Sequence, residues 1–118
     1  MVKKILIAED ELIVAHSLKR NIEEKGYSVC DIVKTGKDAV RLALEKQPDL
    51  LIVDIFLEDE TDGIDAVKNI HEKKFIPVIY TTASSDRLTY AKARETEMLK
   101  YLTKPYDIGE LFEVIKSI

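Results

Sequence analysis

The chain has 118 residues, of which 46% are hydrophobic and 34% charged, a composition typical of one soluble domain with one core. Its net charge of −4 argues against nucleic-acid binding by this domain, because such binding needs a dense basic surface. The sequence has no apolar run long enough to cross a bilayer, no signal-peptide pattern and only one cysteine, Cys30, which together favour the cytoplasm.

The first two predicted elements are a strand and a helix. Residues 5–8 are apolar, which predicts a short buried strand, and an acidic run, 9–11, follows directly. Apolar residues then recur at three- and four-residue spacings to about Lys25, which predicts an amphipathic helix. The expected buried stripe of this helix is Leu12, Ala15, Leu18 and Ile22. Gly26 suits the end of the helix, because glycine adopts the left-handed conformation at little cost.

The third predicted strand carries the residue around which the site is organised. Residues 28–33 predict a strand interrupted by the polar Asp31, and residues 37–46 predict a helix. Residues 50–54 follow as four apolar side chains that end in Asp54. Such an uninterrupted run is typical of a strand buried on both faces of a parallel sheet. Asp54 is therefore expected at the carboxyl end of a strand, where open α/β sheets place their chemistry.

The middle of the chain predicts a loop, a helix and a strand. An acidic loop, 58–63, leads into an apolar helical pattern for which Asp62 is the expected N-cap. Residues 76–80 predict a fourth strand, which runs on towards Thr82.

The last part of the chain predicts a weaker helix over 85–97 and a strand over 99–103, after which Lys104 and Pro105 follow. Asp107 and Glu110 have the spacing of a capping box, which marks the start of the final helix. The expected stripe of that helix is Ile108, Leu111, Val114, Ile115 and Ile118.

Five strands that alternate with five helices predict an α/β fold, a parallel sheet with helices on both faces. Asp31 and Lys100 mark the second and fifth strands as edge strands, because central strands do not tolerate such residues. The natural strand order is 2-1-3-4-5, the (βα)5 flavodoxin-like winding.

This topology brings polar residues from four strands to one edge of the sheet. The residues expected there are Glu9, Asp10, Asp54, Thr82 and Lys104. Two like charges ~4 Å apart repel by about 4 kcal/mol at an effective dielectric of ~20, so three carboxylates favour a divalent cation such as Mg²⁺. Lys104 suits a phosphate group and Thr82 can donate a hydrogen bond. The pattern predicts phosphoryl chemistry with Asp54 as the nucleophile.

Five stretches form an ordered set along the chain: 5–11, 48–54, 62–63, 77–83 and 101–105. This set resembles the receiver domain of two-component response regulators over essentially the whole length. The resemblance implies a single receiver domain over 1–118, with Asp54 accepting a phosphoryl group from a phosphohistidine on a sensor histidine kinase or a phosphotransfer protein. Whether an effector module follows Ile118 is left open by the sequence, as are the cognate kinase and the oligomeric state.

The resemblance also implies roles for single residues. Glu9, Asp10 and Asp54 would hold Mg²⁺, for which Mn²⁺ can substitute, and the backbone carbonyl of Phe56 would be a further ligand. Lys104 would contact the phosphoryl group, and the Lys104-Pro105 peptide bond would be cis.

A conformational switch is implied in the same way. Thr82 would move towards the phosphoryl group, and Tyr101 would turn inward into the space that Thr82 leaves. The surface formed by 85–97, 99–103 and 108–118 would then contact a partner or a second copy of the chain. The segment from Asp54 to Gly63 departs from the commonest family form, because it is one residue longer and lacks a proline.

By this interpretation the chain is not an enzyme with a separate substrate but a phosphoacceptor that catalyses its own phosphorylation and dephosphorylation. Three alternatives are open. A magnesium-dependent hydrolase would want a general acid two residues after Asp54, where the chain has Phe56. A nucleotide-binding enzyme would want a glycine-rich loop where 9–11 is acidic. A receiver that binds partners without phosphorylation would have no need to combine Asp54, Thr82 and Lys104.

Overall fold

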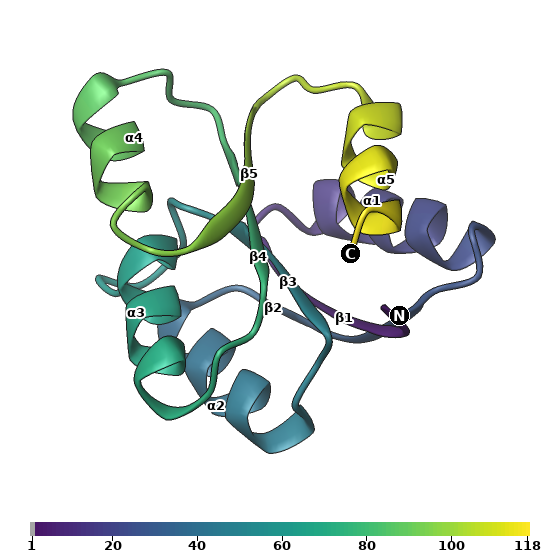
Figure 1. The fold of residues 1–118 in the computed structure, drawn as a ribbon, viewed down its shortest axis with the longest axis horizontal. Helices are drawn as coiled ribbons and strands as arrows, with labels where there is room; N and C mark the ends of the chain where they lie inside the picture. Colours follow the sequence, from purple (N-terminus) through teal and green to yellow (C-terminus); the bar gives the residue numbers. More distant parts are fainter. Residues whose placement is uncertain (1) are drawn as a thin grey trace.

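The computed structural model describes residues 2–118 (Figure 1). Within these residues, strands and helices alternate along the chain. The strands are β1 (Lys4–Ala8), β2 (Ser28–Val33), β3 (Leu50–Asp54), β4 (Val78–Thr82) and β5 (Met98–Thr103). The helices are α1 (Leu12–Glu24), α2 (Gly36–Lys46), α3 (Gly63–Lys73), α4 (Arg87–Ala93) and α5 (Ile108–Lys116).

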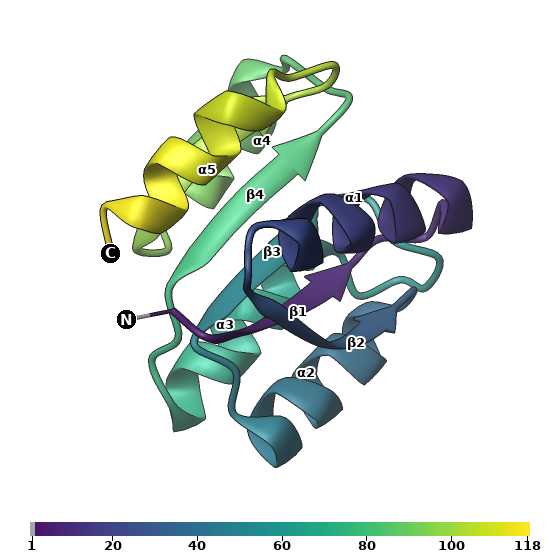
Figure 2. The ribbon, with the colours of Figure 1, turned by 90° about the vertical axis from the view of Figure 1, so that its right-hand side faces the viewer.

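The strands form one parallel sheet in the order β2-β1-β3-β4-β5, which confirms the predicted topology. In Figure 2 the arrowheads of β1 and β4 point the same way, so their carboxyl ends share one edge of the sheet. Asp31 and Lys100 both lie on edge strands, as their polarity indicated. All five residues of β3 are buried, as expected for a central strand covered on both faces.

Helices cover both faces of the sheet (Figure 1). Because side chains alternate along a strand, each central strand contributes to two apolar layers. Leu50 and Ile52 of β3 pack with α1 and α5, whereas Leu51 and Val53 pack with α2, α3 and the end of α4. None of the helices within residues 2–118 combines the length and apolar character that a membrane span requires.

Helix ends follow the predicted local chemistry in most places. Gly26 has φ +95° and ends α1: its N–H donates to Glu23 O at 3.0 Å, and the Tyr27 N–H donates to Ile22 O at 3.3 Å. This pair of bonds is the Schellman arrangement. At the start of α3, the Asp62 carboxylate accepts from the Asp65 N–H at 2.8 Å.

Several local predictions were wrong. The fourth helix covers only Arg87–Ala93, and Leu88 on it is 79% exposed. Leu12, predicted on the buried stripe of α1, is 46% exposed. Asp107 caps α5 through the Gly109 N–H, but the Glu110 carboxylate forms an ion pair with Lys100 at 3.6 Å, on the strand beside it.

The apolar stripe of α5 also differs from the expectation. Phe112 is buried although it lies outside the predicted stripe, whereas Ile118 is 43% exposed. The helix therefore buries Leu111, Phe112 and Ile115 against the sheet.

Candidate functional site

Three carboxylates meet at the carboxyl edge of the sheet, where they form a rim of Glu9, Asp10 and Asp54 together with Lys104. β1 and β3 are neighbouring parallel strands with Ala8 opposite Val53, so Glu9, which follows β1, and Asp54, the last residue of β3, come out side by side. One carboxylate oxygen from each of Glu9, Asp10 and Asp54 lies within 4.8 Å of the others. Glu9 and Asp54 are only 3% and 6% exposed, so their charges need compensation.

Lys104, at the end of β5, provides part of that compensation. Its ammonium group donates to Glu9 Oε1 at 2.7 Å and to Asp54 Oδ2 at 2.9 Å. Burial works to lower the pKa of Lys104, but the hydrogen bonds to Glu9 and Asp54 outweigh it and raise that pKa above its ordinary value. The ammonium group is therefore charged at neutral pH. The peptide bond between Lys104 and Pro105 is cis, as the resemblance implied.

Backbone groups orient the two buried carboxylates. The Phe56 N–H donates to Asp54 Oδ1 at 3.1 Å, so the two oxygens of Asp54 have different partners. The Glu11 N–H donates to Glu9 Oε2 at 3.2 Å. Phe56 itself is 53% exposed and stands beside the rim.

Thr82 lies at the end of β4, next to the rim but outside the ionic cluster. Its side chain is fully buried, and its Oγ1 accepts from the Ser84 N–H at 3.1 Å. Asp54 pairs in register with Thr81, so Thr82 extends one residue further along the sheet. Because the hydroxyl accepts one bond here, its own hydrogen is free to donate to another group.

Tyr101 lies on β5, further from the carboxylates, and packs under α4. Its ring meets that of Tyr90 edge-on, with 5.0 Å between the ring centroids. In the part of the chain that the structure describes, the Tyr101 hydroxyl is buried with no hydrogen-bond partner. Burial raises the pKa of this phenol, and the nearby Asp86 and Tyr90 raise it further.

The donor chemistry of the rim fits a magnesium ion. Three carboxylates and one ammonium group leave two uncompensated negative charges, and carboxylate oxygen is the ligand type that Mg²⁺ prefers. Of the site residues predicted from the sequence, the structure brings Glu9, Asp10, Asp54 and Lys104 together, and Thr82 lies beside them.

Sequence reasoning missed the contact between Glu9 and Lys104, and it missed the role of Asp59. Asp59 reaches the N-terminus of α2, where it accepts from the Gly36 N–H at 2.7 Å and from the Lys37 N–H at 3.1 Å. The only sign of this role in the sequence was an acidic loop with no assigned function. The partner of Asp59 could not be predicted because it lies 23 residues away in the chain.

Comparison with known proteins agrees with this geometry. Residues 5–116 match the response regulator receiver domain family. A curated relative, the transcriptional regulatory protein PdtaR of Mycobacterium tuberculosis (strain CDC 1551 / Oshkosh), is 36% identical over 114 residues, covering 97% of this chain and 55% of the relative. The same identity and coverage hold for the protein from strain ATCC 25618 / H37Rv. The chain thus spans about half the length of these curated relatives.

Solved structures show the same likeness. The signal receiver domain of a modulated diguanylate cyclase from Desulfovibrio desulfuricans G20 is 31% identical, with a TM-score of 0.91 over 99% of this chain and 93% of that one. The response regulator domain of CheB from Thermotoga maritima is 26% identical, with a TM-score of 0.89 over 99% and 96%. Because the family match spans nearly the whole chain, this protein belongs to the response regulator receiver domain family.

Proposed function

We propose that residues 1–118 act as one phosphorylation-controlled switch, in which Asp54 accepts a phosphoryl group from a phosphohistidine on a sensor histidine kinase or phosphotransfer protein. The observation that supports this most directly is the meeting of Asp54 with a lysine and two further carboxylates at one buried rim. In the transfer, a carboxylate oxygen of Asp54 bonds to phosphorus, the P–N bond breaks, and the imidazole leaves and takes a proton.

Receiver domains generally bind Mg²⁺, and the residues of this rim fit that ion. Glu9, Asp10 and Asp54 would hold it, with the backbone carbonyl of Phe56, and Mn²⁺ would substitute. When bound, such an ion neutralises charge on the phosphoryl oxygens.

Lys104 would stabilise the phosphorylated form. Its ammonium group already lies 2.9 Å from Asp54 Oδ2, so oxygens added at that carboxylate come within its reach. The second contact, to Glu9 at 2.7 Å, keeps the ammonium group charged and aimed at the rim while Asp54 reacts. Lys104 thus acts as a positioned cation for phosphate.

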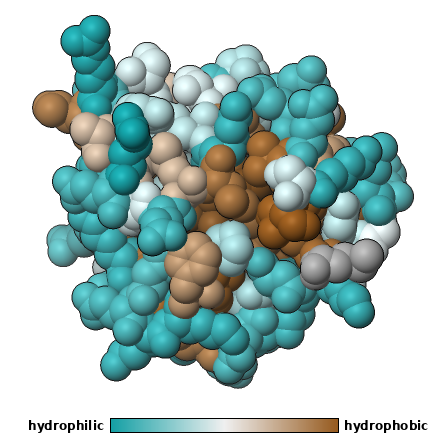
Figure 3. Space-filling model, in the orientation of Figure 1, coloured by the Kyte–Doolittle hydropathy of each residue, from teal (hydrophilic) through white to brown (hydrophobic). Residues whose placement is uncertain are grey.

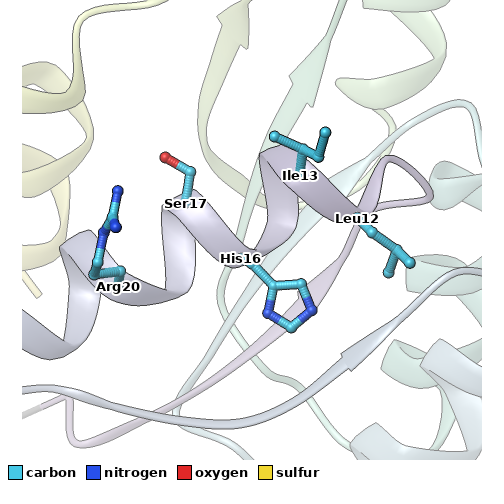
Figure 4. Close-up of a pocket in the computed structure, with 5 residues that line it drawn as sticks. All are labelled: Leu12, Ile13, His16, Ser17 and Arg20. Carbon is cyan, nitrogen blue, oxygen red and sulfur yellow. The ribbon is translucent and has the colours of Figure 1, made fainter.

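The phosphodonor needs a surface beside the rim, and α1 offers one. An open hollow on this helix is lined by Leu12, Ile13, His16, Ser17 and Arg20 (Figure 4). Ile13 is 87% exposed, and both apolar residues lie in the first turn, directly after the acidic residues of the rim. A partner seated there would bury apolar surface while its histidine approaches Asp54.

Thr82 and Tyr101 would relay the change. In the phosphorylated state, Thr82 gains a charge-assisted hydrogen bond that the resting state lacks, and Tyr101 turns into the space that Thr82 leaves. The unsatisfied hydroxyl of Tyr101 supports this proposal, because a buried polar group without a partner makes the resting position less favourable.

The output surface would be α4, β5 and α5, which could also form a homodimer. Figure 3 shows an apolar area that extends from the middle of one face towards the place where Figure 1 puts the end of α5. Leu99 on β5 and Ile118 after α5 are each 43% exposed. A contiguous apolar area on a polar surface is typical of a contact site.

One assay tests the proposal. The protein is incubated with magnesium and acetyl phosphate or phosphoramidate, and its mass is measured. We expect one added phosphoryl group on the native chain and none on Asp54→Asn. The matched control Asp31→Asn changes an aspartate in the middle of β2, whose carboxylate pairs with Lys46 at 3.6 Å and, within residues 2–118, contacts no residue of the rim, and should be phosphorylated as the native chain is.

The same assay separates the alternatives. Steady turnover of a phosphoester would indicate a hydrolase. No change in mass on the native chain would indicate a receiver that binds partners without phosphorylation, and either result would overturn the proposal.

A further inference from the structure

The loop between β3 and α3 is fastened to the N-terminus of α2. Its most direct contact is made by Asp59, whose carboxylate accepts from the Gly36 N–H at 2.7 Å and from the Lys37 N–H at 3.1 Å. These are the first two residues of α2, whose backbone N–H groups have no partner within the helix. The next N–H, of Asp38, donates to the Thr35 hydroxyl at 3.1 Å. The helix start therefore takes one cap from its own segment and one from the distant loop.

Two further contacts hold the same loop in place. The Glu58 N–H donates to Lys34 O at 3.1 Å, so the main chain also joins the loop to the segment before α2. Thr61 lies directly against Gly36, and a side chain at position 36 would collide with its backbone carbonyl. Gly36 therefore allows the close approach of loop and helix, and Asp59 fixes it.

The other end of the loop reaches the rim. Ile55 is anchored on both sides, because its N–H donates to Thr81 O at 3.1 Å and its carbonyl accepts from the Gly63 N–H at 2.7 Å. Phe56 follows and donates its N–H to Asp54 Oδ1. Only Leu57 separates Phe56 from Glu58, and Asp59 follows directly, so a loop released from α2 frees the Phe56 peptide group as well.

We propose that Asp59 is a positioning residue for the metal site: by capping α2 it holds the Phe56 backbone where its carbonyl can serve as a ligand and its N–H can orient Asp54. The inference rests on the proposed function, because it needs a metal ion bound at the rim. Residues outside the ligand set commonly change metal affinity in this way when they fix a ligand's orientation.

The test compares two caps at the same helix end. Asp59→Ala removes the cap that joins the β3–α3 loop to the start of α2. Thr35→Ala removes the cap that the residue before α2 provides, and in the described part of the chain the Thr35 hydroxyl makes no hydrogen bond to the loop. Magnesium dissociation constants are measured by calorimetry, and urea unfolding midpoints by circular dichroism. We expect both variants to unfold at lower urea, but only Asp59→Ala to bind magnesium about 10-fold more weakly.

A rate measurement adds a second readout. Because the expected defect lies in metal affinity, phosphorylation of Asp59→Ala by acetyl phosphate should be slow at low magnesium and should approach the native rate at saturating magnesium. Native magnesium affinity in Asp59→Ala, or an equal loss in Thr35→Ala, would overturn the role of Asp59 and leave the proposed function standing. Absence of magnesium binding by the native chain would overturn both.

Discussion

Two tyrosine hydroxyls on neighbouring strands differ in their hydrogen bonding. Tyr80 Oη on β4 lies 2.9 Å from Thr96 Oγ1, which in turn donates to Ala93 O at 2.7 Å. Tyr101 Oη on β5 is buried with no partner among the described residues. Burial raises the pKa of both phenols, but only Tyr80 recovers the cost of burial through a hydrogen bond.

Removal of each hydroxyl should therefore change stability in opposite directions. Tyr101→Phe deletes an unsatisfied group and should stabilise the fold by about 1 kcal/mol, whereas Tyr80→Phe removes the hydrogen bond to Thr96 and should destabilise the fold by about 1 kcal/mol. Urea unfolding of the two variants beside the native chain measures both values. A loss of stability in both variants would mean that the Tyr101 hydroxyl is hydrogen-bonded in solution.

At this scale the sequence predicted which residues meet, but not how they pair. Asp54 ends β3 and Lys104 follows β5, and because the order of the strands could be deduced from polarity, the meeting of the two residues followed from topology. The choice of Glu9 as the second partner of Lys104 depends on side-chain rotamers and on a 2.7 Å approach, neither of which leaves a sequence pattern. Asp59 was equally hidden, because its role depends on the path of a loop.

Among the elements, the predictions succeeded where local chemistry dominates. Gly26, Asp62 and Asp107 each end or begin a helix as expected, because these positions are decided by neighbouring backbone groups. The fourth helix was overestimated. Its periodic apolar pattern was weak, and beyond its last residue, Ala93, the chain leaves the helix and Thr96 bonds both Ala93 O and the Tyr80 hydroxyl on β4.

Asp49 joins two elements and should make the fold sensitive to acid. Its Oδ2 accepts from the Lys3 and Lys4 N–H groups, both at 2.9 Å, so it ties the start of β1 to the turn before β3. These hydrogen bonds lower the pKa of Asp49 below 3.8, the value for an unperturbed side chain. The unfolded chain thus binds this proton at higher pH than the folded chain does, and the stabilisation is complete above about pH 3.8 and is lost as the pH falls through the lower, folded value.

The Asp49→Asn variant tests this reasoning. We expect it to be less stable than the native chain by about 1 kcal/mol at pH 7, since the group is exposed and part of its effect is screened. The difference should shrink as the pH falls below about 4. Unfolding free energies measured across pH 2.5 to 7 give the profile, and a difference that stays constant over that range would contradict the assignment.

Across the whole molecule, burial is distributed unevenly. The central strands β1, β3 and β4 belong to two apolar layers, whereas α4 has seven residues, of which only Ala93 is buried among those described. Ion pairs contribute to holding α4 in place, because Lys92 contacts Asp62 at 3.1 Å and Asp65 at 3.2 Å. In the proposed switch, contacts of this kind would let α4 move and change one surface without disturbing the core.

Hydrogen exchange should reveal this division. The Tyr90 and Arg94 N–H groups close turns of α4, and we expect them to exchange at least about 100-fold faster than amides of β3, because α4 can open while the sheet stays folded. Lys92→Ala removes two partly exposed ion pairs worth together about 0.5 to 1 kcal/mol, so exchange in α4 should accelerate by about two- to fivefold while β1 and β3 are unchanged. Equal acceleration of helix and strand amides would mean that α4 opens only when the whole domain unfolds, and phosphorylation at Asp54 could then not act on this helix alone.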